Sequence, residues 1–139
     1  MNVGELFAAC KHRFDNDDSL VLLARRMYRS TPNREQPPYV NFVIAEHTIE
    51  TTFGGQFAVF QLDLTVVTKQ EHPGRCDQIL KRLREVFDFT TLPGAPFTVG
   101  GFDPVSVTTP EVEDATWKAT IRYAVVLNPL IADQLTRSA

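Results

Sequence analysis

The longest regular pattern in the chain lies near its middle, where two runs alternate between apolar and polar side chains. Tyr39–Phe53 and Gln56–Lys69 each follow this period of two, which is typical of β-strands with one buried face. A glycine pair lies between the runs, and both glycines can adopt the positive φ angles of a tight turn. The pattern therefore predicts a long antiparallel hairpin in which Phe53 lies opposite Gln56.

The predicted register separates the two faces of this hairpin. One face is mixed and acidic at its middle, where Glu46 lies opposite Asp63, and like charges that face each other are unfavourable. A slip of one residue would avoid this clash, but it would mix polar groups into the apolar face, so we keep the two-residue loop. The predicted apolar face consists of Val43, Ala45, His47, Ile49, Val66, Leu64, Leu62 and Phe60.

Two other segments repeat apolar residues at helical spacing, and we predict a helix in each. The first covers Val3–Arg13 and the second Pro73–Phe87, where proline suits the first helical position. Between the first helix and the hairpin we expect a short apolar turn at Leu20–Leu23 and a short strand at Arg26–Arg29. The segment Ser30–Pro38 contains three prolines and predicts a loop.

The C-terminal part of the chain carries the clearest alternation. Thr116–Leu127 predicts a strand whose apolar set begins at Trp117. A shorter strand is expected at Pro104–Thr109, after a loop over Thr90–Gly101 that is rich in proline and glycine. The tail Leu130–Ala139 is expected to be loosely held.

The order of these elements predicts the fold class. A helix, a long hairpin, a second helix and two strands indicate a single α+β domain over residues 1–139. We expect one antiparallel, twisted sheet with both helices packed on its apolar face.

The predicted hairpin is too long for the helices to cover. Strands of this length are roughly 45–50 Å long, whereas the second helix is only about 22 Å long. The far end should therefore project, and large apolar groups there would need a partner. We predict a subunit interface at Ile49, Phe53, Phe57 and Phe60. The alternative is a hairpin that bends or bulges near its middle and folds back on its own sheet.

Composition narrows the classes of partner. The net charge is −3 and the isoelectric point is about 5.6, which argues against a surface that grips nucleic acid. No apolar run reaches the roughly 20 residues of a membrane span, and no signal peptide is apparent. Cys10 and Cys76 fall on apolar helix faces, so we expect two buried thiols in a reducing compartment. A disulfide between them is the alternative, which nothing in the sequence supports.

Candidate chemistry is sparse along the chain. Asp15–Ser19 begins like a calcium loop, but Leu20 stands where that loop needs glycine and Arg26 where it needs a bidentate glutamate. No spacing of histidines or cysteines suggests a metal site or an activated nucleophile. Glu46, Glu50 and Asp63 could do acid–base work, but they lie on an open sheet face. We therefore expect a protein that is not an enzyme and needs no cofactor or metal.

Three stretches of the sequence carry a resemblance to a known family. They are the strand entry "PPYVNF", the helix "CDQILKRLREVF" and the closing strand "ATWKATIRYAVVL". In these stretches and in the order of its elements, the chain resembles the tail terminator, or tail completion, proteins of long-tailed bacteriophages and related prophage particles.

The resemblance implies a structural role in a virion. Such proteins form a ring, typically hexameric, that caps the head-proximal end of the tail tube and joins it to a neck or connector protein. The protein would be made in the host cytoplasm, and DNA would pass through the ring as cargo. An acidic channel wall would let phosphates slide, so we expect Glu46, Glu50 or Asp63 to line it.

The polar loops are candidates for contacts with these neighbouring proteins. We name Arg34, Glu35 and Gln36 in the first loop and Phe97 in the second. Two alternative functions stay open: another neck or tube component of similar fold, and a small-ligand-binding domain with a pocket between helices and sheet. Rings would distinguish a terminator from a tube subunit, which forms open stacks.

Overall fold

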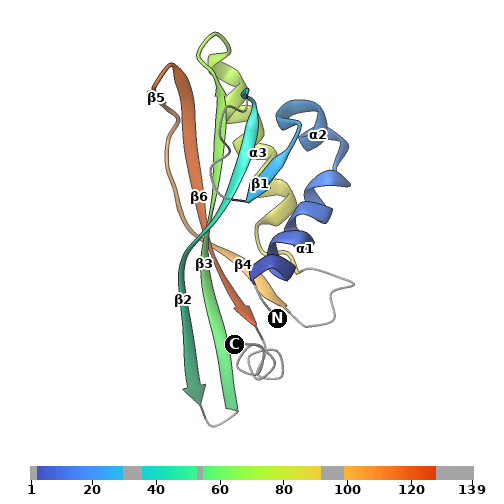
Figure 1. Cartoon of the computed structure of the whole chain (residues 1–139), viewed down its shortest axis with the longest axis vertical. Coiled ribbons are helices and arrows are strands. Elements are labelled where there is room, and N and C mark those ends of the chain that lie inside the picture. Colours follow the sequence, from blue (N-terminus) through green and yellow to red (C-terminus); the bar gives the residue numbers. More distant parts are fainter. Residues whose placement is uncertain (1–2, 30–35, 53–54, 92–98, 128–139) are drawn as a thin grey trace.

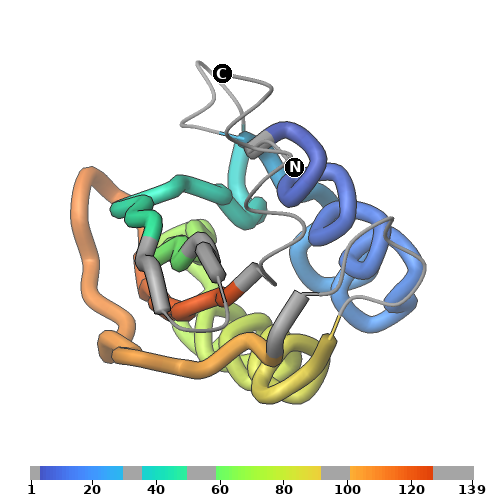
Figure 2. Tube along the Cα trace, turned by 90° about the horizontal axis from the view of Figure 1, so that it is seen from below, coloured from blue at the N-terminus to red at the C-terminus, as the bar shows by residue number. Residues whose placement is uncertain are grey.

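The computed structural model describes the backbone of residues 3–29, 36–52, 55–91 and 99–127, and the side chains of residues 4–29, 36–49, 59–91 and 101–126. Within these ranges, helices lie on one face of a six-stranded sheet (Figure 1). Figure 2, seen from below, shows the helices gathered on one side of the strands. The predicted α+β class is therefore confirmed.

Three helices and six strands make up the described part of the chain. The helices are α1 (Val3–Asp15), α2 (Asp18–Ala24) and α3 (Pro73–Phe87). The strands are β1 (Met27–Arg29), β2 (Tyr39–Thr52), β3 (Gly55–Lys69), β4 (Val99–Val107), β5 (Glu111–Glu113) and β6 (Thr116–Leu127).

The sheet has the order β1-β2-β3-β6-β4, and β5 pairs with β6 on the side away from β3. β1 runs parallel to β2, and the other strand pairs are antiparallel. The prediction of a wholly antiparallel sheet is thus wrong at one edge. Because Met27 pairs with Val40, the chain returns to its starting level after β1 and enters β2 in the same direction.

The core lies between α3, α1 and the inner face of the sheet. Leu83 of α3 and Phe14 of α1 are fully buried, and Phe87 of α3 packs at 5.5 Å between ring centres against Phe102 of β4. Alternate residues of two neighbouring central strands form the floor. They are Phe60, Leu62, Leu64 and Val66 of β3 and Ala119, Ile121, Tyr123 and Val125 of β6.

The hairpin register differs from the prediction because β2 contains a bulge. Thr52 pairs with Gly55, not Phe53 with Gln56, and the pairing shifts between Ile44 and Glu46, where Ala45 is the extra residue. An extra residue inverts the faces of the strand on one side of the bulge. Phe42 and Val40 are therefore buried, whereas Val43, expected in the core, is 39% exposed. Beyond the bulge, His47 regains the predicted face and stacks on Phe60 at 4.5 Å between ring centres.

Three further differences concern short elements. The expected turn at Leu20–Leu23 is helix α2, because Asp17 caps it by accepting a hydrogen bond from the Leu20 amide at 3.0 Å. β4 begins at Val99, inside the segment that proline and glycine marked as a loop. β5 was missed, because three residues are too short to show a period.

Candidate assembly surfaces

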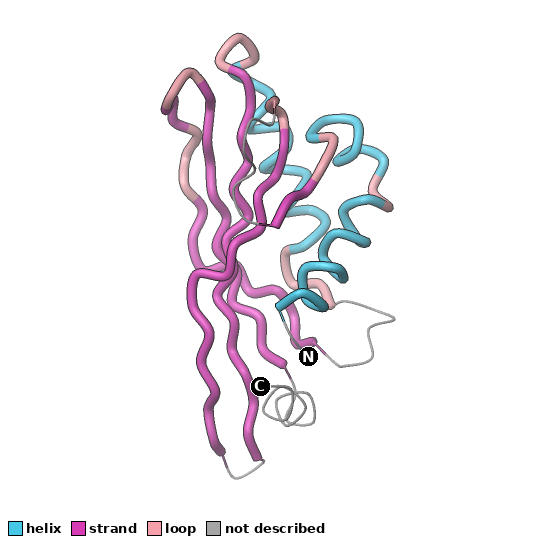
Figure 3. Tube along the Cα trace, in the orientation of Figure 1, coloured by secondary structure: helices cyan, strands magenta, loops and turns pink. Residues whose placement is uncertain are grey.

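The far half of the β2–β3 hairpin extends beyond the helices, as the sequence predicted from strand length. In Figure 1 the helices end well above the lower end of β2 and β3. The strand trace in Figure 3 shows that the hairpin bends near its middle yet continues away from the helices. The bulge at Ala45 accounts for the bend, since bulges kink the strand that carries them. The alternative of a hairpin that bulges and folds back on its own sheet is therefore right about the bulge and wrong about the folding back.

The predicted interface residues have different environments. Ile49 is 46% exposed in the far half of β2, which none of the helices α1, α2 and α3 covers (Figure 1). Phe60 is buried within the single chain, beneath the His47 ring, so the reason for assigning it to an interface is removed. Phe53 and the side chain of Phe57 lie outside the described residues. The interface stays a prediction, and Ile49 is the described residue that carries it.

The predicted acidic face is less acidic than the sequence suggested. Because of the bulge, Glu46 pairs with Gln61, and Asp63 lies opposite Val43 on one side and Arg122 on the other. The guanidinium of Arg122 donates to both carboxylate oxygens of Asp63, at 2.8 and 3.0 Å. This hydrogen-bonded pairing raises the pKa of Arg122.

The other two carboxylates predicted for this face are those of Glu46 and Glu50. Glu46 is exposed. The side chain of Glu50 lies outside the described residues, although its backbone pairs with Phe57. The assignment of Glu46, Glu50 and Asp63 to a channel wall stays a prediction, with Asp63 already neutralised by its partner.

Of the four loop residues predicted to contact neighbouring proteins, the structure describes only Gln36. Gln36 is exposed just before β2. Arg34, Glu35 and Phe97 lie outside the described residues, as does the tail Leu130–Ala139. Their expected contacts with neighbouring proteins stay predictions.

The acidic segment after α1 has a structural role. Asp17, which caps α2, also accepts two hydrogen bonds from Arg82 of α3, from Nε at 3.0 Å and from Nη2 at 2.5 Å. These bonds lower the pKa of Asp17, with the Arg82 hydrogen bond as the main cause. The segment thus ties α2 to α3. Among the described residues, no group of three or more His, Cys, Asp or Glu side chains could hold a metal ion.

Both cysteines are free and buried, so the expectation of two thiols is confirmed. Burial raises the pKa of Cys10 to about 12 and that of Cys76 to about 11. Thiols with such pKa values are protonated at neutral pH, and a thiol is a poor nucleophile. In the described part of the chain, no helix is both long and apolar enough to cross a membrane.

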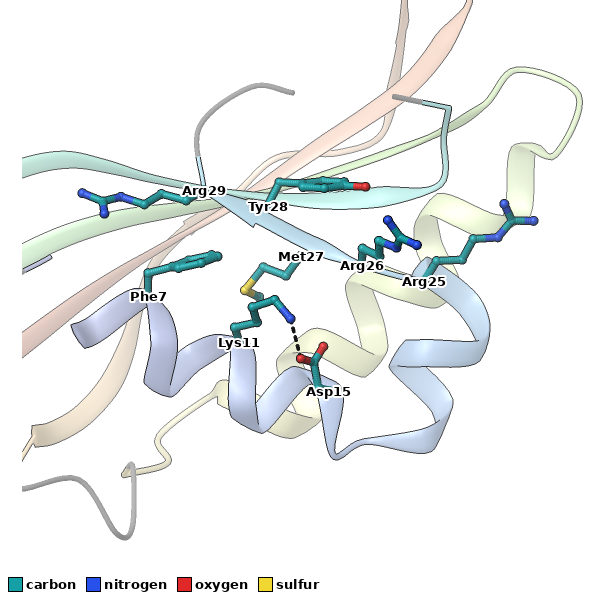
Figure 4. A pocket seen from close by; sticks show the side chains of 8 residues that line it. All are labelled: Phe7, Lys11, Asp15, Arg25, Arg26, Met27, Tyr28 and Arg29. Carbon is teal, nitrogen blue, oxygen red and sulfur yellow. Dashed lines mark hydrogen bonds and ion pairs between the residues drawn. The ribbon is translucent and has the colours of Figure 1, made fainter. Parts of the chain in front are cut away.

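Sequence reasoning missed a groove between α1 and β1. It has a volume of about 630 Å³, and Figure 4 shows side chains from both elements around it. The signal in the sequence was three arginines within five residues: Arg25 and Arg26 directly before β1, and Arg29 at its end. The lining residues are Phe7, Lys11, Asp15, Arg25, Arg26, Met27, Tyr28 and Arg29.

Comparison with known proteins places the fold. No family model matches the sequence, and no curated protein matches it. A solved chain from the virion of a native gene transfer agent (GTA) particle is similar in structure, with a TM-score of 0.70 and 15% sequence identity. That match covers 89% of this chain and 95% of the other. A second solved chain, whose name describes no function, matches with a TM-score of 0.63 and 14% identity over 92% of this chain and 96% of its own.

Proposed function

We propose that this protein is a structural component of a phage-like particle, and that it acts there as the tail terminator. Copies of the chain form a ring, typically hexameric, at the head-proximal end of the tail tube. The ring ends polymerisation of the tube and joins it to a neck or connector protein. DNA passes through the ring as cargo, and the protein has no catalytic role.

The observation that carries this proposal is the shared fold with a chain of a gene transfer agent virion. The match runs over nearly the whole of both chains, so it concerns the complete domain and not one motif. It supports a place in the virion, and the sequence stretches that resemble tail terminators support the finer assignment. The fold alone is common to proteins of different function, so this step is an analogy.

The projecting hairpin gives the proposal a physical basis. In a lone protomer none of the described helices covers the far half of the hairpin, where Ile49 is 46% exposed (Figure 1). A neighbouring copy in a ring would bury this surface, and a head-to-tail contact closes into a ring when the rotation between copies allows it.

Negative-stain electron microscopy and sedimentation velocity of the purified protein test the proposal. We expect closed rings of one thickness. Open stacks of variable length would instead assign the protein to the tube, and a stable monomer at micromolar concentration would contradict both assignments. Assembly with the purified tube protein is the second readout, because a terminator shortens the tubes that form.

A matched pair of variants connects this test to the hairpin. Ile49→Asp places a charge on the projecting surface and should prevent ring formation. Leu22→Asp changes an aliphatic side chain that is 81% exposed on α2, at the other end of the molecule, and should leave the rings intact. Both variants should keep the wild-type unfolding midpoint, because neither side chain is buried.

A further inference from the structure

The groove between α1 and β1 combines an apolar floor with a cationic rim. Phe7 supplies the apolar surface beside Met27, which is itself buried, and Tyr28 lies on the other side of the strand (Figure 4). Arg25 and Arg26 stand at the entrance to β1. Arg29 extends from the other end of the strand. The groove thus offers a short apolar surface with positive charge at both ends.

The three arginines have no acidic partner within the described part of the chain. The ion pairs there engage Lys11, Arg82, Arg84 and Arg122. The one carboxylate that lines the groove, Asp15, is bound by Lys11 at 2.6 Å. A protein with a net charge of −3 therefore concentrates positive charge at one edge of its sheet, without an acidic partner among the described residues. Guanidinium groups in such a place favour a partner with carboxylates, which they bind in a bidentate geometry.

The opposite edge of the sheet has the complementary pattern. β5 has the sequence Glu111-Val112-Glu113, and all three side chains are exposed. Val112, 47% exposed, lies on the opposite face of the strand from the two carboxylates, and Asp114 follows in the turn. Lys118 is the cross-strand neighbour of Glu111, whereas Glu113 pairs with the uncharged Thr116. This edge therefore carries net negative charge around an apolar centre.

The two edges lie at the same level of the sheet. The strand registers align Met27 of β1 with Val40, Val66 and Ala119 across the sheet. Glu111 of β5 pairs with Lys118, the residue next to Ala119 in β6. A second copy placed beside the first can therefore bring its β5 against the first copy's groove without a large shift along the strands.

We propose that β5 of one copy docks in the groove between α1 and β1 of the next copy. Val112 lies on the apolar floor. The carboxylates of Glu111 and Glu113 leave the other face of the strand, where the long arginine side chains at both ends of the groove reach them. The contact is heterologous, because it joins two different surfaces, and repetition closes a ring. This inference rests on the proposed ring and names one surface that holds its subunits together.

A DNA backbone is the competing partner for these arginines, but the other residues that line the groove favour a protein. Phosphate binding draws on a broad array of cations, whereas this groove has an apolar floor and contains the carboxylate of Asp15. The partner must therefore present apolar surface together with negative charge. β5 presents both.

Charge reversal on the two surfaces tests the proposal. One variant carries Arg26→Glu and Arg29→Glu, and the other carries Glu111→Arg and Glu113→Arg. Each variant alone should associate at least about tenfold more weakly in sedimentation velocity, because like charges then meet at every contact. An equimolar mixture should regain the rings, since the two variants can alternate around the ring with opposite charges at each contact.

The controls make every outcome decisive. Lys81→Glu reverses an exposed charge on α3, outside the groove, and should assemble like the wild type. If the reversed arginine variant does not keep the wild-type unfolding midpoint, Arg26→Gln with Arg29→Gln replaces it. A smaller weakening in the same direction is then expected, because the attraction is lost but no like charges meet.

Normal rings from both charge-reversed variants would overturn this docking surface and leave the proposed ring intact. A mixture that stays dissociated would also overturn it. Normal rings with a loss of DNA binding in the arginine variant would assign the groove to nucleic acid instead. A wild-type protein that never forms rings would contradict the proposed function itself.

Discussion

Arg122 of β6 holds the carboxylate of Asp63 in β3 through two hydrogen bonds across the outer face of the sheet, at 2.8 and 3.0 Å. The two residues are direct cross-strand neighbours. A carboxylate that the sequence assigned to a channel wall is thus paired within its own protomer, so any acidic wall depends on Glu46 and its neighbours more than on Asp63.

This pair leads to a prediction about salt. Arg122→Gln should lower the stability of the protein because Asp63 loses its partner, and the loss should shrink at high ionic strength, where the charges are screened. Urea unfolding at low and high salt measures both effects. Lys118→Gln, a change on the same strand and face, is the control and should have a smaller effect. Equal losses for the two variants at both salt concentrations would contradict this role of the pair.

The Asp17–Arg82 contact predicts how stability responds to acid. The folded-state pKa of Asp17 is lowered, so its contribution to stability is fully present above the unfolded value of 3.8 and is lost as the pH falls through the folded value. Asp17→Asn should therefore flatten the decline of stability below pH of about 4. Chemical unfolding of both proteins at several pH values measures this, with Asp18→Asn as the control. An unchanged acid profile in Asp17→Asn would contradict the assignment.

The core between α3 and the sheet predicts a large difference between two leucines. Leu83 is fully buried and Leu22 is 81% exposed. Leu83→Ala should lower the free energy of unfolding by about 2–5 kcal/mol, because it leaves a cavity in the core. Leu22→Ala should change it by less than about 0.5 kcal/mol. Urea unfolding measures both, and similar losses at the two positions would show that the packing around α3 is not as described.

The raised pKa values of the two thiols predict slow modification. Cys10 and Cys76 should react with a thiol reagent at neutral pH only as fast as the protein opens, because both are buried and protonated in the folded state. In urea both thiols should react within the mixing time. Rapid reaction of one thiol in the native protein would contradict its burial, and a Cys76→Ala variant would identify which one.

Much of the fold follows from local patterns that involve one element at a time. The strand Thr116–Leu127 and the helix Pro73–Phe87 have the predicted bounds, because each buries a regularly spaced set of residues against the core. The alternation in the hairpin also predicted the length of both strands to within one residue. These features depend on periodicity and capping, which a single sequence displays.

The features that sequence reasoning missed depend on two elements at once. Nothing near Ala45 marks it as the extra residue of a bulge, since the shift is decided by how β2 fits the curved surface of β3. The parallel pairing of β1 and the groove beside it arise from where the chain re-enters the sheet. The arginines around Met27 were visible in the sequence, but only the fold sets them against α1.

The bulge at Ala45 gives a final prediction, which connects the fold to assembly. Ile44 pairs with Leu62 and Glu46 pairs with Gln61, so deletion of Ala45 would leave a regular ladder and keep every other residue on its present face. The variant should fold with a free energy of unfolding within about 1 kcal/mol of the wild type, because Ala45 is exposed. Its hairpin would lack the bend, so Ile49 would be displaced from its contact with the neighbouring copy and the rings should be lost.

Deletion of Thr48 provides the contrast to this variant. That residue pairs regularly with Val59, so its loss moves the far part of β2 to the opposite face and should destabilise the protein as well as prevent assembly. Urea unfolding together with sedimentation velocity separates the two effects. A protein without Ala45 that still forms normal rings would show that the bend has no part in assembly, because its folding and its side-chain faces are otherwise those of the wild type.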